Sequence, residues 1–334
     1  MRAPLRLGLL STAAINDVQL AAAAESNRVE VVAVASRTAE RARTYAAEHG
    51  IERAHGAYEG LLADAGVDAV YVSLPNALHA EWAIRALEAG KHVLCEKPFH
   101  ADPAEVERAF DAADAAGLVL TEAFQFRHHP QTDELVRLVR DGAIGALRVI
   151  RSFLGFTPES AADIRFRPEL DGGAFLDAGC YTVNVARLLA GEPEQVVAEQ
   201  VLGDTGVDVA FAGTMHFAGG VLAQVGASYL VPLRRELELL GSEGSIRVRD
   251  PFRPDRSGLI EVERGGEVVE SVAAARDDAY RLQLENLADA AAGRAEPRLG
   301  RADAIAQARA LAALYRSARE GVGVPTSPAA AAAR

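Results

Sequence analysis

Lysine is the scarcest charged residue in this 334-residue chain. Only Lys91 and Lys97 occur, and arginine supplies the rest of the 35 basic residues. The 47 acidic residues outnumber the basic ones and give a net charge of −12. An acidic chain without arginines interleaved with aromatic residues argues against contact with a phosphate backbone. The composition therefore predicts no nucleic-acid partner.

Cysteine is nearly as scarce. Cys95 and Cys180 are too few for a disulfide framework and lack metal-ligand spacing. The adjacent His128 and His129 have no third ligand at helical spacing, so no metal site is predicted. No apolar run reaches the length of a membrane span, about 18 residues, and no signal-peptide pattern opens the chain. These absences predict a cytoplasmic protein without a membrane partner.

The glycine fingerprint of dinucleotide-binding folds, G-x-G-x-x-G, is missing after the first predicted strand, residues 5–10. Small residues take its place, in the order Ser-Thr-Ala-Ala-Ile-Asn over residues 11–16. They still allow the backbone to approach a pyrophosphate at a helix N-terminus, although Ser-Thr also occurs as an ordinary helix cap. If a dinucleotide binds, the predicted contacts in this window are Ser11, Thr12, Ala13 and Ile15.

A carboxylate is missing at the end of the second predicted strand, residues 29–35. An NAD site uses Asp or Glu there for the ribose hydroxyls, whereas this chain has Ser36, Arg37 and Thr38, with Arg41 one turn later. Cations and hydroxyl groups suit a 2′-phosphate, so NADP is favoured over NAD. The alternative is that Ser36 caps a helix and both arginines are merely solvated.

Strand-like and helical segments alternate regularly over residues 1–122. This alternation predicts an α/β fold with a doubly wound parallel sheet, a Rossmann-type dinucleotide-binding domain. Residues 123–326 are expected to form a second, α+β domain that binds substrate and mediates oligomerisation, and residues 327–334 to form a frayed tail.

The second domain is predicted to contain a large, open, mostly antiparallel sheet. About six strand-like runs with glycine-rich turns follow Glu194. Two helices, at about 279–292 and 302–320, should cover one face of this sheet. The other face is then a candidate surface for a homodimer or homotetramer.

Two stretches carry candidate chemistry. Lys97 ends a strand-like run and precedes Pro98, which holds its amine in a defined direction, and lysine, unlike arginine, can release its proton. The segment 174–189 has helical spacing, and Asp177, Tyr181 and Asn184 share one face of it at i, i+4 and i+7. From these residues alone, a solvated strand-end lysine and a satisfied polar patch remain open.

Four motifs together resemble the glucose–fructose oxidoreductase / inositol dehydrogenase (Gfo/Idh/MocA) family. They are Ser-Leu-Pro-Asn-Ala-Leu-His at 73–79, Glu-Lys-Pro at 96–98, Glu-Ala-Phe-Gln-Phe-Arg at 122–127 and Gly-Gly-Ala-Phe-Leu-Asp-Ala-Gly-Cys-Tyr at 172–181. Within the family, the chain is most similar to the branch with trans-dihydrodiol dehydrogenases and NADP-dependent aldose dehydrogenases. Tyr181 stands where the inositol branch has a histidine.

The resemblance implies an enzyme that transfers hydride between NADP(H) and a carbon of a small sugar or cyclic diol. It implies that Lys97 lies beside the nicotinamide, that Tyr181 or Lys97 exchanges the proton, and that Asp177 orients Lys97 or a substrate hydroxyl. It also implies a cis Lys97–Pro98 bond. Further expected cofactor contacts are Leu74, Pro75, Asn76, His79, Glu96, Lys97, Arg127 and Arg165.

Two other functions remain open at this stage. One is a ketoreductase for a nucleotide-linked deoxysugar, which would use the same Lys97 and Tyr181. The other is a regulator that binds a dinucleotide without catalysis, which the presence of both residues disfavours.

Overall fold

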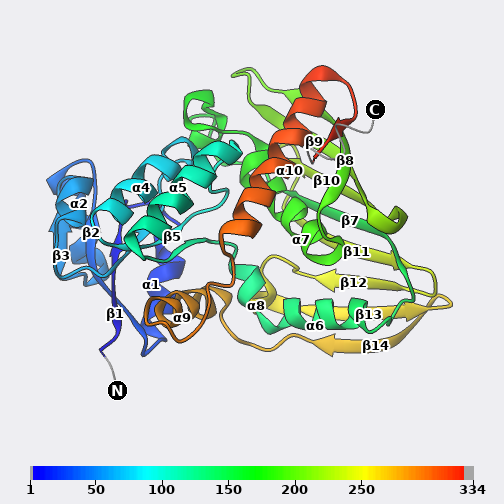
Figure 1. Cartoon of the computed structure of the whole chain (residues 1–334), viewed down its shortest axis with the longest axis horizontal. Coiled ribbons are helices and arrows are strands. Elements are labelled where there is room, and N and C mark those ends of the chain that lie inside the picture. The colour runs from blue at the N-terminus through cyan, green and yellow to red at the C-terminus, as the bar shows by residue number, and fades with distance from the viewer. Residues whose placement is uncertain (1–2, 327–334) are drawn as a thin grey trace. The chain divides into compact units, whose positions relative to one another are not determined.

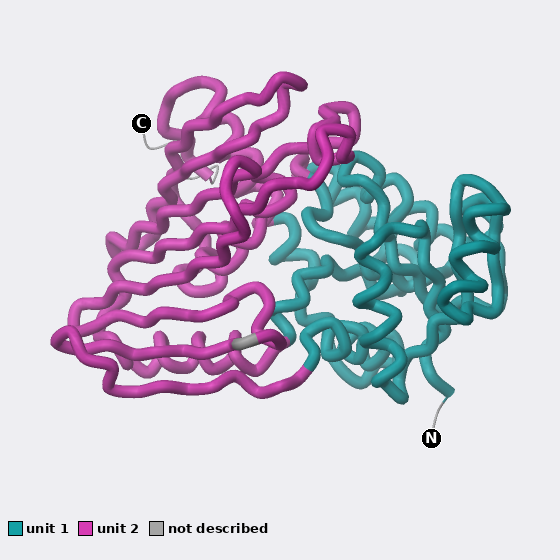
Figure 2. The backbone as a smooth tube through the Cα atoms, turned by 180° about the vertical axis from the view of Figure 1, so that it is seen from behind, with its two compact units in different colours: residues 1–100, 104–128, 278–305 teal, residues 101–103, 129–277, 306–334 magenta. Residues whose placement is uncertain are grey.

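The computed structural model describes residues 3–326 and divides them between two compact units. Figure 2 shows the first unit, residues 1–100, 104–128 and 278–305, in teal and the second, residues 101–103, 129–277 and 306–334, in magenta. The predicted frayed tail, residues 327–334, lies outside the described residues.

The first unit is built on a six-stranded sheet in the order β3-β2-β1-β4-β5-β6, with every neighbouring pair parallel. This order confirms the predicted doubly wound fold (Figure 1). The strands are β1 (Leu5–Leu9), β2 (Val29–Ala35), β3 (Arg53–His55), β4 (Ala69–Val72), β5 (His92–Cys95) and β6 (Leu120–Glu122). The helices are α1 (Asn16–Ala24), α2 (Ala39–His49), α3 (Tyr58–Leu62), α4 (His79–Glu88), α5 (Pro103–Ala116) and α9 (Ala279–Ala291), with 3-10 turns η1 (Asn76–Leu78) and η2 (Gln125–His128).

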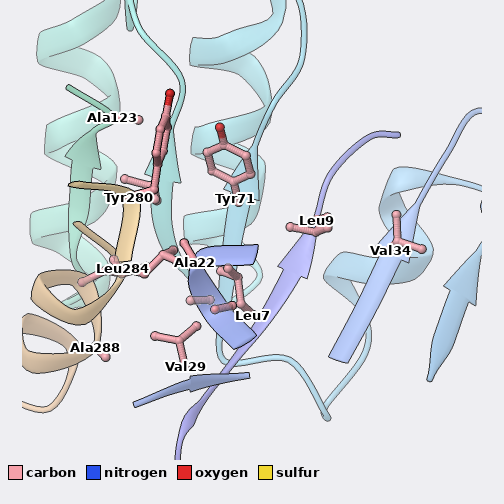
Figure 3. Close-up of a cluster of buried hydrophobic side chains, with 14 of the residues drawn as sticks. Leu7, Leu9, Ala22, Val29, Val34, Tyr71, Ala123, Tyr280, Leu284 and Ala288 are labelled. Atoms are coloured by element: carbon pink, nitrogen blue, oxygen red, sulfur yellow. The ribbon is translucent and has the colours of Figure 1, made fainter. Parts of the chain in front are cut away.

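The central strands of this sheet are mostly apolar because helices cover both faces of the sheet. Leu7, Leu9 and Tyr71 are fully buried in the core that Figure 3 shows. Tyr280 and Leu284 of α9 belong to the same core. The prediction that α9 would cover the second sheet was therefore wrong: its apolar face packs against the first unit instead.

The second unit is built on a nine-stranded sheet in the order β14-β13-β12-β11-β7-β10-β9-β8-β15. All the described pairs are antiparallel except β7 with β10, which confirms the predicted large, mostly antiparallel sheet. The strands are β7 (Leu147–Gly155), β8 (Pro193–Leu202), β9 (Asp208–Phe217), β10 (Leu222–Ser228), β11 (Arg234–Gly241), β12 (Ser245–Arg249), β13 (Leu259–Arg264), β14 (Glu267–Ala273) and β15 (Val324–Pro325).

Helices pack on one face of this second sheet. α6 (Pro130–Arg140) contacts β13, and α7 (Cys180–Ala190) contacts β7 and β10 (Figure 1). The C-terminal part of α10 (Arg301–Glu320) reaches the same face, where the Ser317 hydroxyl accepts the Ala198 N–H at 2.9 Å. The remaining elements are the short helix α8 (Pro254–Ser257) and the 3-10 turns η3 (Ile164–Phe166), η4 (Pro168–Leu170) and η6 (Ala218–Gly220).

The predicted helix over residues 174–189 contains an irregular turn. Residues Phe175–Gly179 form a π-helix, η5, and the α-helix α7 begins only at Cys180. A π-helix adds a residue to the turn and shifts the side chains that follow it. The i, i+4, i+7 spacing assumes a regular α-helix, and this turn departs from that geometry.

Candidate functional site

The turn after β1 is shaped by side-chain hydrogen bonds instead of glycines. The Ser11 hydroxyl lies 2.9 Å from the Ser73 carbonyl and 2.8 Å from the Ser73 hydroxyl, and it accepts the Ala13 N–H at 3.1 Å. The buried Asn16 donates to the Ser11 carbonyl at 2.8 Å. None of residues 11–16 has a positive φ, so the turn does not require the conformational freedom of glycine.

Two exposed cations lie at the end of β2. Thr38 caps α2 by accepting the Arg41 N–H, and the Arg41 guanidinium donates to the Thr12 hydroxyl at 3.2 Å. The positive charges of Arg37 and Arg41 both act on the phenol of Tyr58, whose pKa is nevertheless raised, chiefly by burial. Thr12 and Arg41 are thus in contact, and the charges of Arg37 and Arg41 both reach Tyr58.

Ser36 has a different place. Its side chain is 4 % exposed, and its backbone N–H donates to His55. Tyr58, whose ring packs edge-on against Trp82 at 4.9 Å, was missed by the sequence reading. It lies in a short helix, α3, that gives little periodic signal.

The Pro-Asn-x-x-His motif follows β4. Asn76 opens the turn η1, and His79 begins α4. The His79 ring is buried between two backbone carbonyls, with Nε2 2.7 Å from Leu74 O and Nδ1 2.8 Å from Pro98 O. Burial lowers the pKa of His79 to about 4, although the two carbonyls act in the opposite direction. As a neutral ring, His79 donates to only one of these two carbonyls, and the ring lies between the end of β4 and the Glu-Lys-Pro turn.

The Glu96-Lys97-Pro98 turn follows β5 directly. The Lys97–Pro98 bond is cis, which confirms that prediction. Tyr71, from the neighbouring strand β4, donates its phenolic hydroxyl to one Glu96 oxygen, and the Lys97 N–H donates to the other at 3.3 Å. The pKa of Tyr71 is raised far above its usual range, first by burial and then by the Glu96 charge, so Tyr71 remains a donor.

The two lysines of the chain have different environments. The Lys91 ammonium donates to the carbonyls of Asp64 (2.9 Å) and Val67 (2.8 Å), and its side chain is buried. Lys97 is half-buried at a strand end. Lys91 therefore holds a loop, while Lys97 is placed where open α/β sheets present groups to ligands.

A second polar group lies in the second unit, around Asp177. The Arg165 Nε donates to Asp177 Oδ2 at 2.7 Å, and Arg165 Nη1 lies 3.2 Å from both oxygens of Asp163. The Tyr229 hydroxyl lies 3.0 Å from Gly173 O and 3.2 Å from Asp177 Oδ2. The pKa of Tyr229 is strongly raised by burial and the Asp177 charge, and that of Arg165 is raised chiefly by Asp177.

Two other predicted residues, Tyr181 and Asn184, lie on the same helix. The half-buried Tyr181 ring lies 5.3 Å from the Phe252 ring. Asn184 is buried and donates weakly, at 3.4 Å, to Gln307, which donates in turn to the Cys180 carbonyl at 2.9 Å. Asn184 thus belongs to the packing between α7 and α10.

Arg127 is placed in the first unit. Its guanidinium lies 3.6 Å from the Asp303 carboxylate, and only 12 % of its side chain is exposed. Within residues 3–326, no group of three or more His, Cys, Asp or Glu side chains is arranged to hold a metal ion. In the same range, no helix is long and apolar enough to cross a membrane.

Comparison with known proteins places the chain among oxidoreductases. Residues 5–124 match the model of an oxidoreductase family with an NAD-binding Rossmann fold, and residues 132–247 match that of the GFO/IDH/MocA C-terminal domain. The chain is 36% identical over 323 residues to D-xylose 1-dehydrogenase (NADP(+)) 2 of Haloferax volcanii, covering 96% of this chain and 99% of that protein. It is also 36% identical over 221 residues to trans-1,2-dihydrobenzene-1,2-diol dehydrogenase of Xenopus laevis, covering 66% and 67%.

Among solved structures, KijD10, a 3-ketoreductase from Actinomadura kijaniata in complex with NADP and TDP-benzene, superimposes with a TM-score of 0.89. It is 33% identical, and the match covers 94% of this chain and 98% of that one. Both family models and relatives that match nearly the full length agree with the fold described above. The chain therefore belongs to the GFO/IDH/MocA family of oxidoreductases.

Proposed function

We propose that this protein is an NADP(H)-dependent oxidoreductase acting on a CH–OH group of a free aldose or a cyclic diol. The observation that carries the cofactor assignment is the contact between Arg41 and Thr12, which joins the ends of β1 and β2 where no carboxylate is present. The 2′-phosphate of NADP requires cations and hydroxyl groups at this place. Arg37, Arg41 and Thr12 would hold it, with Ser11, Ala13 and Ile15 along the pyrophosphate.

When bound, NADP(H) supplies or accepts the hydride. The substrate hydroxyl must exchange a proton in the same reaction, so an acid–base group is needed within hydrogen-bond reach. Tyr181 is the proposed group, and the Lys97 ammonium stabilises the developing alkoxide. The exchange of these two roles is the alternative, because lysine can also release a proton.

Asp177 serves in this proposal as a fixed anion and not as a proton carrier. Its carboxylate already accepts from Arg165 at 2.7 Å and lies 3.2 Å from the Tyr229 hydroxyl. A carboxylate so paired favours its charged form. Glu96 has a similar part in the first unit, where Tyr71 holds it beside Lys97.

The surroundings of Asp177 suit a substrate with several hydroxyl groups. One guanidinium, Arg165, contacts two carboxylates, Asp163 and Asp177. The rings of Phe156 and Phe166 pack against Tyr229 at 5.3 and 5.5 Å. Carboxylates and aromatic rings suit a polyhydroxylated ring, because carboxylate oxygens accept hydrogen bonds from hydroxyl groups.

A nucleotide-linked deoxysugar ketoreductase is the second candidate. The structural similarity to KijD10 over nearly the whole chain favours it. A dinucleotide-binding regulator without catalysis is a third and weaker possibility, since both Lys97 and Tyr181 are present.

A homodimer or homotetramer through the open face of the second sheet is also part of the proposal. Alternating charges cross this face: Arg151 pairs with Glu238 at 3.2 Å, and Arg247 with Glu263 at 3.4 Å. A depression of about 900 Å³ lies among these strands. Exposed apolar side chains on β8 add to the surface, namely Val197 and Val201. Such a mixed surface can pair with its own copy, and sedimentation of the purified protein tests this.

The proposed location is the cytoplasm, because the two cysteines of the sequence, Cys95 and Cys180, are buried and form no disulfide bond. Fractionation of the source cells tests the location.

The test of the activity is a substrate panel. The protein is incubated with NADP or NAD and with aldoses, inositols or aromatic dihydrodiols, and the absorbance of the reduced cofactor is followed. Reduction of NADP by an aldose or a dihydrodiol supports the proposal. No reduction with the panel, but oxidation of NADPH by a nucleotide-linked keto-deoxysugar, supports the second candidate instead.

A further inference from the structure

A buried carboxylate lies at the start of the helix that bears Tyr181. Asp208, the first residue of β9, is 3 % exposed. Its Oδ2 accepts the Phe175 N–H at 2.7 Å, and its Oδ1 accepts the Tyr315 hydroxyl of α10 at 2.7 Å. Burial raises the pKa of Asp208, while these donors act in the opposite direction. A carboxylate is retained in such a place only if its partners compensate for the lost hydration.

The paired glycines before the helix make room for this arrangement. Gly173 has φ +127°, and a Cβ there would lie 2.3 Å from Asp208 Oδ1. At Gly172, a Cβ would lie 2.4 Å from the Arg165 carbonyl oxygen. Both glycines therefore permit a close approach to the backbone, and at Gly173 the approaching group is the Asp208 carboxylate.

The segment that Asp208 caps is the π-helix η5. A π-turn is less regular than an α-turn, and its first N–H groups need partners outside the helix. A negative charge at a helix N-terminus is also favourable. The Phe175 ring adds a second anchor, because it stacks on Phe211 at 3.8 Å and packs edge-on against Tyr315 at 5.4 Å. The backbone N–H and the ring of Phe175 are thus both held in place.

We propose that Asp208 is a positioning residue of the reaction, which holds the first turn of this helix so that Asp177 and Tyr181 keep their places. The proposal rests on the proposed function, in which Tyr181 exchanges the proton. Asp208 is only 3 % exposed, so it has little surface for direct contact with a substrate. It acts instead through the Phe175 N–H, which its Oδ2 accepts.

The two oxygens of Asp208 allow a matched comparison in the full-length protein. Asp208→Ala removes the acceptors for both the helix and α10, whereas Tyr315→Phe removes only the donor from α10 and keeps the ring. Asp208→Asn keeps an acceptor for the Phe175 N–H, with its amide group facing the Tyr315 oxygen. If the alanine variant does not fold, Asp208→Leu removes the acceptor while keeping the branched shape of the side chain.

The measurements are kcat, the KM for NADPH, the melting temperature, and hydrogen exchange of peptides covering residues 173–181. We expect Asp208→Ala to lose about a hundredfold in kcat, the usual effect of a misplaced catalytic group, with an unchanged KM for NADPH and faster exchange. Tyr315→Phe should melt earlier but keep kcat within about twofold, and Asp208→Asn should recover most of kcat.

Equal losses of kcat in Asp208→Ala and Tyr315→Phe would overturn the proposal, since they would reflect general destabilisation. Unchanged exchange at residues 173–181 in Asp208→Ala would also overturn it, whatever the activity. If the wild-type protein shows no turnover, but Asp208→Ala still speeds hydrogen exchange at residues 173–181, the proposed function is refuted. The structural role of Asp208 at the helix N-terminus would then still hold.

Discussion

The arginine pair at the end of β2 offers the sharpest test of cofactor choice. Replacing both Arg37 and Arg41 by alanine removes two cations that would contact the 2′-phosphate. A hydrogen bond to a charged group contributes about 1.5–3 kcal/mol, and exposure reduces this to about 1–2 kcal/mol for each arginine here. The pair should therefore account for about 2–4 kcal/mol, or roughly 30- to 700-fold in the Kd for NADPH.

The assay is a fluorescence titration of NADPH and NADH against the wild type, the double variant and Arg43→Ala. Arg43 is an equally exposed arginine of the same helix, two residues from Arg41 and so on another side of α2. NADH lacks the 2′-phosphate, so its Kd should stay the same in every variant. The NADPH affinity of the wild type should also fall with added salt. Equal loss for NADPH and NADH, or an equal effect of Arg43→Ala, would refute the assignment.

Further predictions concern the proton carrier, acid stability and the Glu96 contact. Tyr181→Phe should bind NADPH as the wild type does and lose turnover by about a hundredfold or more; full turnover would remove Tyr181 from the mechanism. Lys97→Arg keeps the charge but cannot release a proton, so retained turnover would limit Lys97 to an electrostatic role. The folded pKa of His79, about 4, lies below its unfolded value of 6.5, so the unfolded state binds the proton first. Stability should therefore fall by about 3 kcal/mol as the pH drops from about 6.5 to about 4, and urea unfolding of His79→Gln should show a smaller loss. Tyr71→Phe should lower the free energy of unfolding by about 2 kcal/mol, because Glu96 loses a buried donor; an unchanged urea midpoint would contradict this.

The parallel sheet of the first unit could be predicted because its signals are local. Runs such as Val29–Ala35 and Ala69–Val72 are apolar except for Glu30, and the helix that follows the first run ends on Gly50. The short elements β3 and α3 were not predicted, because three to five residues give no usable periodicity. The packing partner of α9 could not be predicted from the sequence either, because an apolar helix face does not specify which sheet it covers.

The candidate site was harder to predict than the fold, because it depends on local irregularity and on contacts between distant residues. The spacing of Asp177, Tyr181 and Asn184 assumes a regular α-helix, and the π-turn at Phe175–Gly179 breaks this assumption. A cue was present in Gly179, where a Cβ would lie 2.1 Å from the Phe175 ring. The motif at 172–181 begins with two glycines, but the sequence could not indicate Asp208, which lies more than 30 residues later and meets Gly173 only in the folded chain.

The scarcity of lysine identified candidate residues but did not distinguish a structural lysine from a catalytic one. It singled out two residues, and the fold gives them opposite characters. Lys91 is buried, and its ammonium donates to the carbonyls of Asp64 and Val67 in the loop before β4. These two hydrogen bonds suit a compact ammonium group with a structural role. What separates Lys97 is its setting, at a strand end, half-buried, after a glutamate that Tyr71 holds in place. The rarity of lysine therefore points to Lys91 and Lys97 as candidates, and the groups around each ammonium indicate whether its role is structural or catalytic.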